Sequence, residues 1–236
     1  MSDEVEELPD PPLQILITGR KGQGKSELAY MLWDSWPGDR ALVDITGDVT
    51  KLHPEPDTEL LSEPLPARWP RHLTSDRARS SIAFVPDMGS ASALDEIDRM
   101  VGLAYAHGDT LLFVDEFGVA APANRCRPHM RRALHQGRHR RLSELLTCPR
   151  PTDIETLGIA NADVIYAFDL PNRADRERIA DYAGYDRSDV HQAFSELSDH
   201  GYLRFVAKRK ELVIFPPLPL GKNKRSAERH FEREVV

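Results

Sequence analysis

The chain has 236 residues, of which 40% are hydrophobic, and a formal charge of −7 at pH 7. This length and composition suit one sizeable α/β domain, and no run approaches the roughly 18 apolar residues that a membrane-spanning helix needs. The first residues are acidic, unlike a secretory signal, and two cysteines, Cys126 and Cys148, are too few for a disulfide framework or a four-cysteine zinc site. We therefore expect an intracellular protein.

A glycine-rich segment at 18–26 carries the clearest motif in the sequence. It reads TGRKGQGKS and fits the P-loop pattern G-x-x-x-x-G-K-[ST], after an apolar strand expected at 13–18 and before a helix expected at 26–36. In such a loop backbone N–H groups surround the phosphates, Lys25 reaches the β- and γ-phosphates, and the Ser26 hydroxyl binds Mg²⁺. The residues expected to hold ATP are Gly19, Arg20, Lys21, Gly22, Gln23, Gly24, Lys25, Ser26 and Glu27.

Beyond the loop, apolar runs and amphipathic segments alternate, which predicts a mostly parallel sheet covered by helices. Strands are expected at 40–47, 81–87, 110–118, 142–148 and 163–170, and helices at 93–108, 128–140, 173–183 and 188–200. Five prolines and scattered charges between 51 and 80 predict a long loop or insertion, and apolar runs within 201–217 predict a C-terminal β-hairpin.

The strand TLLFV at 110–114 is followed by two acidic residues, which form the second candidate site. Asp115 stands where parallel sheets place their ligands, so it is expected to share Mg²⁺ with Ser26. Glu116 is expected to polarise the water that attacks the γ-phosphate. A kinase needs no such base, and the chain lacks a guanine-reading Asn-Lys-x-Asp. The predicted reaction is therefore ATP hydrolysis.

Between Phe117 and Ser143 there is no acidic residue, although the chain as a whole is acidic. Two interpretations remain open, a solvated helix face or a functional basic surface that meets an anion or a partner. The arginines of this basic segment are Arg125, Arg127, Arg131, Arg132, Arg138, Arg140 and Arg141.

The stretch from 135 to 179 resembles the FtsK-HerA superfamily. It contains Gly-Arg-His at 137–139, Arg-Pro at 150–151, Ala-Asp at 162–163 and Asn-x-x-Asp at 172–175, and the resemblance extends over about 13–181. Among the branches of that superfamily, the chain is most similar to genome-packaging ATPases of tailless, internal-membrane viruses. One departure is Cys148, preceded by Thr147, where the family usually has a glutamine that senses the γ-phosphate.

The resemblance implies a RecA-like (ASCE) P-loop fold, a ring that is usually hexameric, and an arginine that completes a neighbour's site. Arg138, in Gly-Arg-His, is the preferred trans arginine and Arg141 the second choice. Either Thr147 or Arg150 takes the sensor role, or sensing is weakened. The remaining arginines are expected to face double-stranded DNA, with capsid vertex proteins as further partners. The expected location is the host cytoplasm or the virion.

We divide the chain into an acidic flexible tail at 1–12, an ATPase domain at 13–218 and a charged tail at 219–236. The predicted function is ATP-driven translocation that packages viral double-stranded DNA. One alternative is a related ATPase for conjugation, chromosome handling or filamentous-virus assembly and secretion, which usually carries additional domains. The other is a P-loop nucleotide kinase, in which the basic segment would form a phosphate-clamping lid.

Overall fold

The computed structural model describes residues 11–54, 57–69, 80–207 and 209–218. The tail predicted at 219–236 and most of the one predicted at 1–12 lie outside these ranges. The strands are β1 (Gln14–Thr18), β2 (Asp39–Val43), β3 (Glu59–Leu61), β4 (Ser81–Phe84), β5 (Thr110–Val114), β6 (Ser143–Cys148), β7 (Val164–Ala167), β8 (Tyr202–Val206) and β9 (Glu211–Phe215).

Eight α-helices and two short 3₁₀ turns occur in the described part of the chain. They are α1 (Lys25–Asp34), α2 (Asp48–Leu52), α3 (Ala93–His107), α4 (Phe117–Ala120), α5 (Pro128–Gln136), η1 (Gly137–Arg140), η2 (Pro151–Asp153), α6 (Leu157–Ala160), α7 (Arg173–Ala183) and α8 (Arg187–Glu196). None of these helices is long and apolar enough to cross a bilayer.

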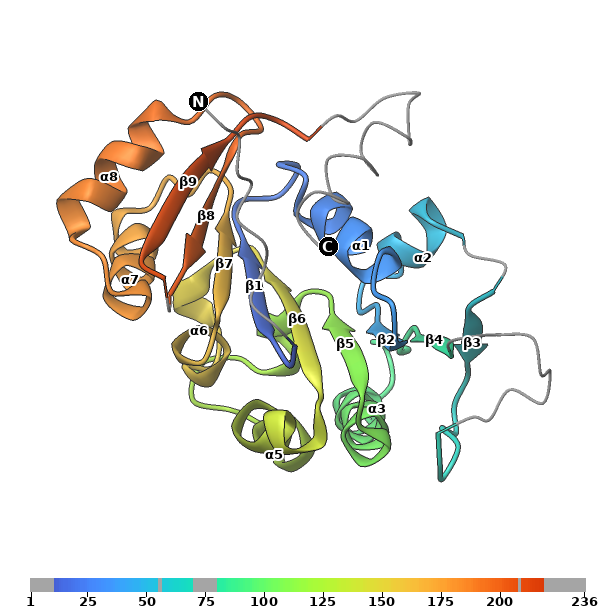
Figure 1. Cartoon of the computed structure of the whole chain (residues 1–236). Coiled ribbons are helices and arrows are strands. Elements are labelled where there is room, and N and C mark those ends of the chain that lie inside the picture. The colour runs from blue at the N-terminus through green and yellow to red at the C-terminus, as the bar shows by residue number, and fades with distance from the viewer. Residues whose placement is uncertain (1–10, 55–56, 70–79, 208, 219–236) are drawn as a thin grey trace.

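The described strands form one sheet in the order β3-β4-β2-β5-β6-β1-β7-β8-β9 (Figure 1). Every pair from β3 to β7 is parallel, and β8 and β9 add an antiparallel hairpin, as predicted. The expected α/β P-loop fold is therefore confirmed. One strand, β6, separates β1 from β5, which is the arrangement that the predicted RecA-like fold requires.

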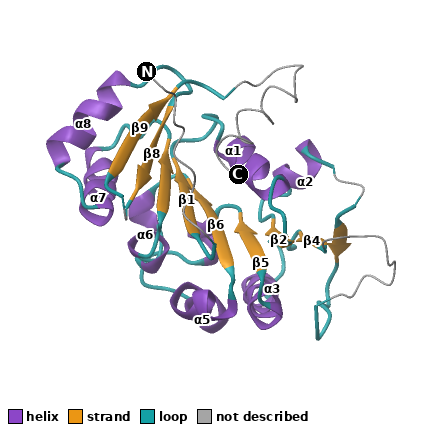
Figure 2. Ribbon diagram, viewed as in Figure 1, coloured by secondary structure: helices purple, strands orange, loops and turns teal. Residues whose placement is uncertain are grey.

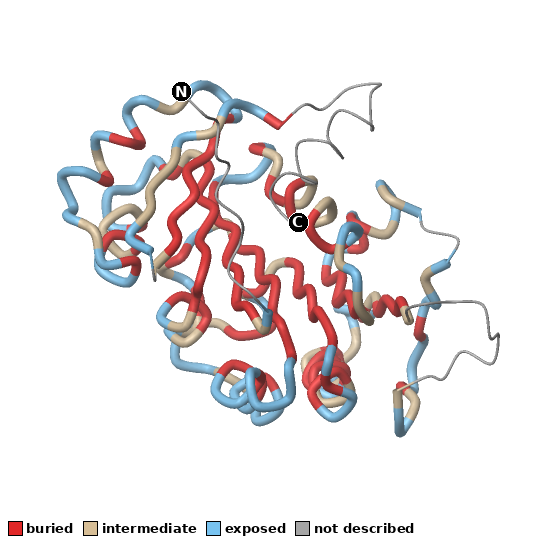
Figure 3. The backbone as a smooth tube through the Cα atoms, viewed as in Figure 1, coloured by how far each residue is buried: buried red, intermediate tan, exposed pale blue. Residues whose placement is uncertain are grey.

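Both faces of the sheet are buried by helices (Figure 2). In β1 the side chains of Ile15 and Ile17 pack with α1, while Leu16 belongs to the core formed with α3, α5, α7 and α8. This alternation explains why the strands read as continuous apolar runs, since a parallel strand covered on both faces has no polar side. The strands between the two edge strands β3 and β9 accordingly form the buried centre of the molecule (Figure 3).

The proline-rich region at 51–80 is more regular than the sequence indicates. Residues Glu59–Leu61 form β3, a three-residue edge strand parallel to β4. Leu61 is buried, while Glu59 and Leu60 are exposed. So short a strand falls below the length at which alternation can be recognised, and its pairing depends on a partner more than twenty positions away. The parts of this region at 55–56 and 70–79 are outside the described residues.

Candidate functional site: the P-loop and the acidic strand end

The P-loop follows β1 and ends at Gly24, the N-cap of α1. Gly19, Gly22 and Gly24 have φ of +144°, +83° and +103°, which L side chains rarely adopt. A Cβ on Gly19 would lie 2.6 Å from the Cβ of Phe168, so a larger residue there would displace the loop. The glycines thus allow the backbone to turn its N–H groups towards the helix N-terminus, where an anion is favoured.

Lys25, the first residue of α1, is buried, with 8% of its surface exposed. Its Nζ donates a hydrogen bond to the Arg20 carbonyl at 3.2 Å, so the side chain folds back over the loop. Burial lowers the pKa of Lys25, while the nearby negative charges, with Glu116 foremost, raise it. The geometry places one ammonium between the loop and the two acidic residues after β5.

Asp115 lies at the carboxyl end of β5 with 4% of its surface exposed. Its Oδ1 accepts a hydrogen bond from the Thr147 hydroxyl at 2.7 Å, and its Oδ2 accepts one from the Thr46 hydroxyl at 3.4 Å. Burial raises the pKa of Asp115 to about 6, with the charges of Glu116 and Asp44 adding to the rise. A carboxylate held in a site where its charge is so unfavourable is well suited to a cation.

Glu116 has φ +52° and ψ +48°, the left-handed conformation. This conformation is uncommon outside glycine and asparagine, and it occurs where surrounding structure stabilises it. Here the backbone N–H of Glu116 donates to the Thr147 hydroxyl at 3.0 Å. One hydroxyl therefore fixes both the side chain of Asp115 and the backbone of Glu116.

Asp44 is a third carboxylate at this edge, and sequence reasoning did not single it out. It follows β2, is fully buried, and accepts hydrogen bonds from the backbone N–H and the hydroxyl of Thr50, both at 2.8 Å. Its other oxygen, Oδ1, is buried without a partner among the described residues. The sequence signal that could have identified Asp44 is an acidic residue directly after an apolar strand. That signal alone does not place it at the site, because only the sheet order brings β2 beside β5.

These residues fit the expected Mg²⁺. The hydroxyl of Ser26 and the carboxylate of Asp115 are hard oxygen ligands, and the unpaired oxygen of Asp44 can accept a hydrogen bond from a water. No cluster of three or more His, Cys, Asp or Glu side chains arranged to hold a metal is found in the described part of the chain. That is expected where Mg²⁺ takes one or two protein ligands and completes its shell with phosphate and water.

Two candidate γ-phosphate sensors at the end of β6 have other partners. The Thr147 hydroxyl is bonded to Asp115 and Glu116, and Arg150 pairs with the buried Asp175 at 3.1 Å. Cys148 is fully buried, donates to the Thr18 hydroxyl at 3.4 Å, and has a pKa raised to about 12 by burial. It is therefore a neutral core thiol, and Thr147 positions the acidic pair.

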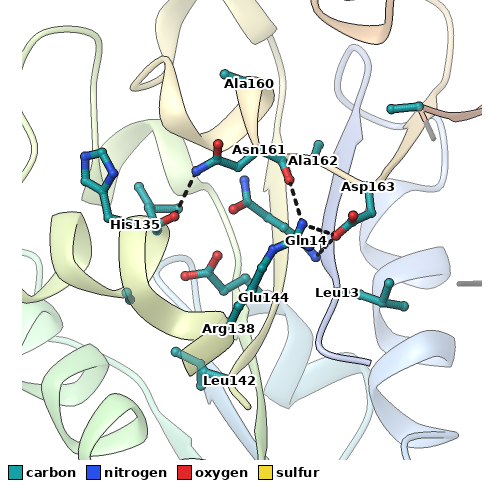
Figure 4. Close-up of a pocket in the computed structure, with 13 residues that line it drawn as sticks. Leu13, Gln14, His135, Arg138, Leu142, Glu144, Ala160, Asn161, Ala162 and Asp163 are labelled. Atoms are coloured by element: carbon teal, nitrogen blue, oxygen red, sulfur yellow. Dashed lines mark hydrogen bonds and ion pairs between the residues drawn. The ribbon is translucent and has the colours of Figure 1, made fainter. Parts of the chain in front are cut away.

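Arg138, the predicted trans arginine, lies in η1 at the opposite, amino-terminal edge of the sheet. Its guanidinium pairs with Asp163 at 2.7 Å (Figure 4). This edge is remote from the chain's own P-loop, so Arg138 is not brought together with Lys25, Asp115 and Glu116. Arg141 is likewise separate, and pairs with Asp109 at 2.6 Å.

More arginines of the basic segment are paired with acidic residues than the sequence indicates. Arg127 pairs with Asp95 of α3, and Arg138 and Arg141 pair with acids outside the segment. Arg140 donates to two carbonyls at the end of α3, and Arg132 lies over the Tyr105 ring at 4.6 Å. The sequence alone could not show these pairings, because all of these partners come from segments distant along the chain. Arg125, Arg131 and Arg132 are exposed and have no acidic partner among the described residues.

The strand order and the P-loop together define a P-loop NTPase fold in which β6 separates the P-loop strand from the acidic strand. No protein-family model matches the sequence, and no curated protein matches it. The structure is similar to the genome packaging NTPase B204 from Sulfolobus turreted icosahedral virus 2, solved with AMP, at a TM-score of 0.66 and 17% identity. That match covers 89% of this chain and 99% of B204.

A second likeness is to the pCW3 conjugation coupling protein TcpA, with a TM-score of 0.53 and 11% identity, over 93% of this chain and 65% of TcpA. The ATPases of EssC from Geobacillus thermodenitrificans are similar at a TM-score of 0.54 and 10% identity, over 94% of this chain and 43% of EssC. The resemblance to FtsK-HerA ATPases noted in the sequence is thus confirmed at the level of the fold.

The raised pKa of Asp115 leads to a prediction about stability. In the folded chain the pKa is about 6 against an ordinary 3.8, so the folded state binds the proton more tightly and stability falls as pH rises from about 4 to 6. The Asp115→Asn substitution removes the carboxyl group, and with it this fall in stability. We expect the nucleotide-free variant to exceed the wild type in free energy of unfolding by up to about 3 kcal/mol at pH 7.5, and by almost nothing at pH 3.5.

Urea unfolding at the two pH values measures the difference. Asp199→Asn, at a side chain that is 79% exposed, is the matched control and should track the wild type throughout. If the free energy of unfolding of Asp115→Asn differed from that of the wild type by the same amount at both pH values, the Asp115 carboxylate would not be the source of the pH dependence.

Proposed function

We propose that this protein is an ATP-hydrolysing translocase of double-stranded DNA, and that it packages viral DNA into a capsid. The observation that carries the ATPase part is the Thr147 hydroxyl, which holds Asp115 and Glu116 at the strand end facing the P-loop. The likeness to B204 over 89% of this chain supports the packaging part. The likeness to TcpA favours a conjugation-type ATPase as the second candidate.

In the proposed reaction the P-loop N–H groups and Lys25 hold the phosphates. Mg²⁺, bound through Ser26 and Asp115, would neutralise charge on the β- and γ-phosphates. Glu116 orients a water and accepts its proton as the water attacks the γ-phosphate. Because the backbone N–H of Glu116 is bonded to Thr147, the point from which the Glu116 side chain extends is fixed.

A kinase is disfavoured by the same geometry. A phosphoryl acceptor other than water would need room beside the γ-phosphate, whereas here the acidic pair occupies that strand end. Two arginines proposed for a kinase lid, Arg127 and Arg140, are also engaged with α3.

DNA contact would fall to Arg125, Arg131 and Arg132, which are exposed and have no acidic partner among the described residues. They project from α5 and the turn before it, and backbone phosphates are the anions that such a surface attracts without reading sequence. In a ring of identical subunits, which we propose with six as the expected number, this surface would line the pore. Capsid vertex proteins are the proposed further partners, and the host cytoplasm or the virion the proposed location.

Two substitutions distinguish the roles proposed for Lys25 and Glu116. Lys25→Ala removes the charge that holds phosphate, so we expect ATP binding and turnover both to be lost. Glu116→Gln keeps the backbone bond to Thr147, so it should bind ATP close to wild-type affinity while turnover falls by about 10²-fold or more. Equilibrium binding and steady-state hydrolysis measure the two effects, with the exposed Lys51→Ala as control. Equal loss of ATP binding in both variants would remove Glu116 from the role of base.

The DNA surface is tested by salt dependence. Each phosphate contact contributes about 0.9 to the slope of log affinity against log salt. Replacing Arg131 and Arg132 by Gln should therefore reduce the slope by up to about two units, measured with duplexes of different sequence. The control replaces Arg173 and Arg187, exposed arginines on α7 and α8, and should leave the slope unchanged. Salt-independent or sequence-specific binding would argue against a translocase.

The trans role of Arg138 is tested by mixing. Arg138→Gln keeps a donor for Asp163 while removing the charge, so each subunit should still bind ATP although hydrolysis collapses. Mixed with Glu116→Gln subunits, the Arg138→Gln subunits keep their own Glu116 and can receive Arg138 from a neighbour, so hydrolysis should partly return. Arg141→Gln is the companion variant. Mixed assemblies that stay inactive, although their mass shows a ring, would exclude Arg138 as the trans arginine.

A further inference from the structure

A pocket of about 420 Å³ opens at the amino-terminal edge of the sheet, away from the P-loop. It lies between the starts of β1 and β6, the end of α5 with η1, and the segment before β7 (Figure 4). Its polar lining consists of Gln14, His135, Arg138, Glu144, Asn161 and Asp163, and alanine and leucine side chains make up the rest. The volume suits a small ligand or one long side chain.

Glu144, near the start of β6, has 4% of its surface exposed and lines this pocket. Its Oε1 is buried with no hydrogen-bond partner in the described part of the chain. Buried carboxylates are normally paired, because an unpaired charge away from water is strongly unfavourable. Its Oε1 is therefore an acceptor that no described residue satisfies.

The neighbouring charges do not supply the missing donor. Asp163 accepts from the Gln14 backbone N–H at 3.0 Å and from Arg138 at 2.7 Å, so the guanidinium of Arg138 is engaged by Asp163. Both Gln14 side-chain N–H groups are directed to the carbonyls of Leu157 and Gly158 at 2.9 and 3.1 Å. With Glu144 ionised, the described residues that line the pocket include two carboxylates, of Glu144 and Asp163, and one guanidinium, of Arg138.

We infer that this pocket binds a guanidinium group carried on a short apolar stem. A guanidinium has donors and no acceptor, its plane matches a carboxylate, and it is weakly hydrated compared with an ammonium. The stem would pack against Leu13, Leu134 and Leu142, which line the pocket beside Glu144. The group can come from a free small molecule or from an arginine of a second copy of this chain. This inference does not depend on ATP hydrolysis.

Binding of a guanidinium beside Glu144 should be linked to release of the Glu144 proton, which can be measured. Burial raises the pKa of Glu144 to about 8, and the Arg138 charge opposes the rise. Below pH 8 the incoming cation must therefore expel the Glu144 proton, whereas a guanidinium keeps its own charge over the whole range. Among the residues that line the pocket, the other charged or titratable side chains are Arg138 from η1, Asp163 before β7 and His135 from α5.

The experiment is calorimetric titration of the full chain with N-butylguanidinium between pH 6 and 9. We expect the affinity to rise by up to about tenfold per pH unit up to about pH 8 and then level off, with close to one proton released per ligand at low pH. N-Butylurea has nearly the same shape without the charge and should bind at least about tenfold more weakly at pH 8.5. In His135→Asn, which lacks the imidazole at the pocket, the rise of affinity with pH should persist.

Glu144→Gln should lose binding by about tenfold or more at pH 8.5 and abolish the pH dependence, and exposed Glu196→Gln is the matched control. Pocket binding is refuted by equal affinity for the urea, by affinity that does not change with pH, or by no binding at pH 8.5. The urea comparison and the pH series use wild-type protein, so they test the inference even if Glu144→Gln fails to fold. Sedimentation then identifies the source: ligand that dissociates assemblies replaces a neighbour's arginine, and unchanged assembly indicates a free small molecule.

Discussion

The hydroxyl of Thr147 is the contact on which the nucleotide site depends. It donates to the side chain of Asp115 and accepts from the backbone of Glu116, so two residues with different proposed roles are held by one atom. The bond exists because β6 lies beside β5 in the sheet. Strand order, more than any local motif, therefore sets the distance between the lysine proposed to bind phosphate and the carboxylate proposed to activate water.

The parts of the site that could be predicted are those that are local in sequence. The P-loop combines a strand, a glycine-rich turn and a helix within about twenty residues, and Asp115 and Glu116 directly follow a strong apolar run. Because backbone geometry and chemistry are specified together there, the structure reproduces the strand and helix on either side of the loop, and β5 directly before Asp115.

The parts that could not be predicted depend on pairings between distant segments. Asp44 reaches the site only through the β2–β5 pairing, and β3 is too short to show a period. The acids that pair with Arg127, Arg138 and Arg141 lie more than twenty positions away. Counting charges within a window therefore overstated the positive field of the basic segment, since a folded chain neutralises charge in three dimensions.

Strand β6 runs through the centre of the sheet from the edge with the pocket to the edge with the P-loop. Glu144 stands at its second position and Thr147 at its fifth, so about 10 Å of extended backbone separates the pocket from the acidic pair. Both flanking strands are hydrogen-bonded to it along its length, which makes it a stiff element. The spacing between the Glu144 carboxylate and the Thr147 hydroxyl is therefore fixed by the sheet itself, and a group bound at the first would lie at a set distance from the second.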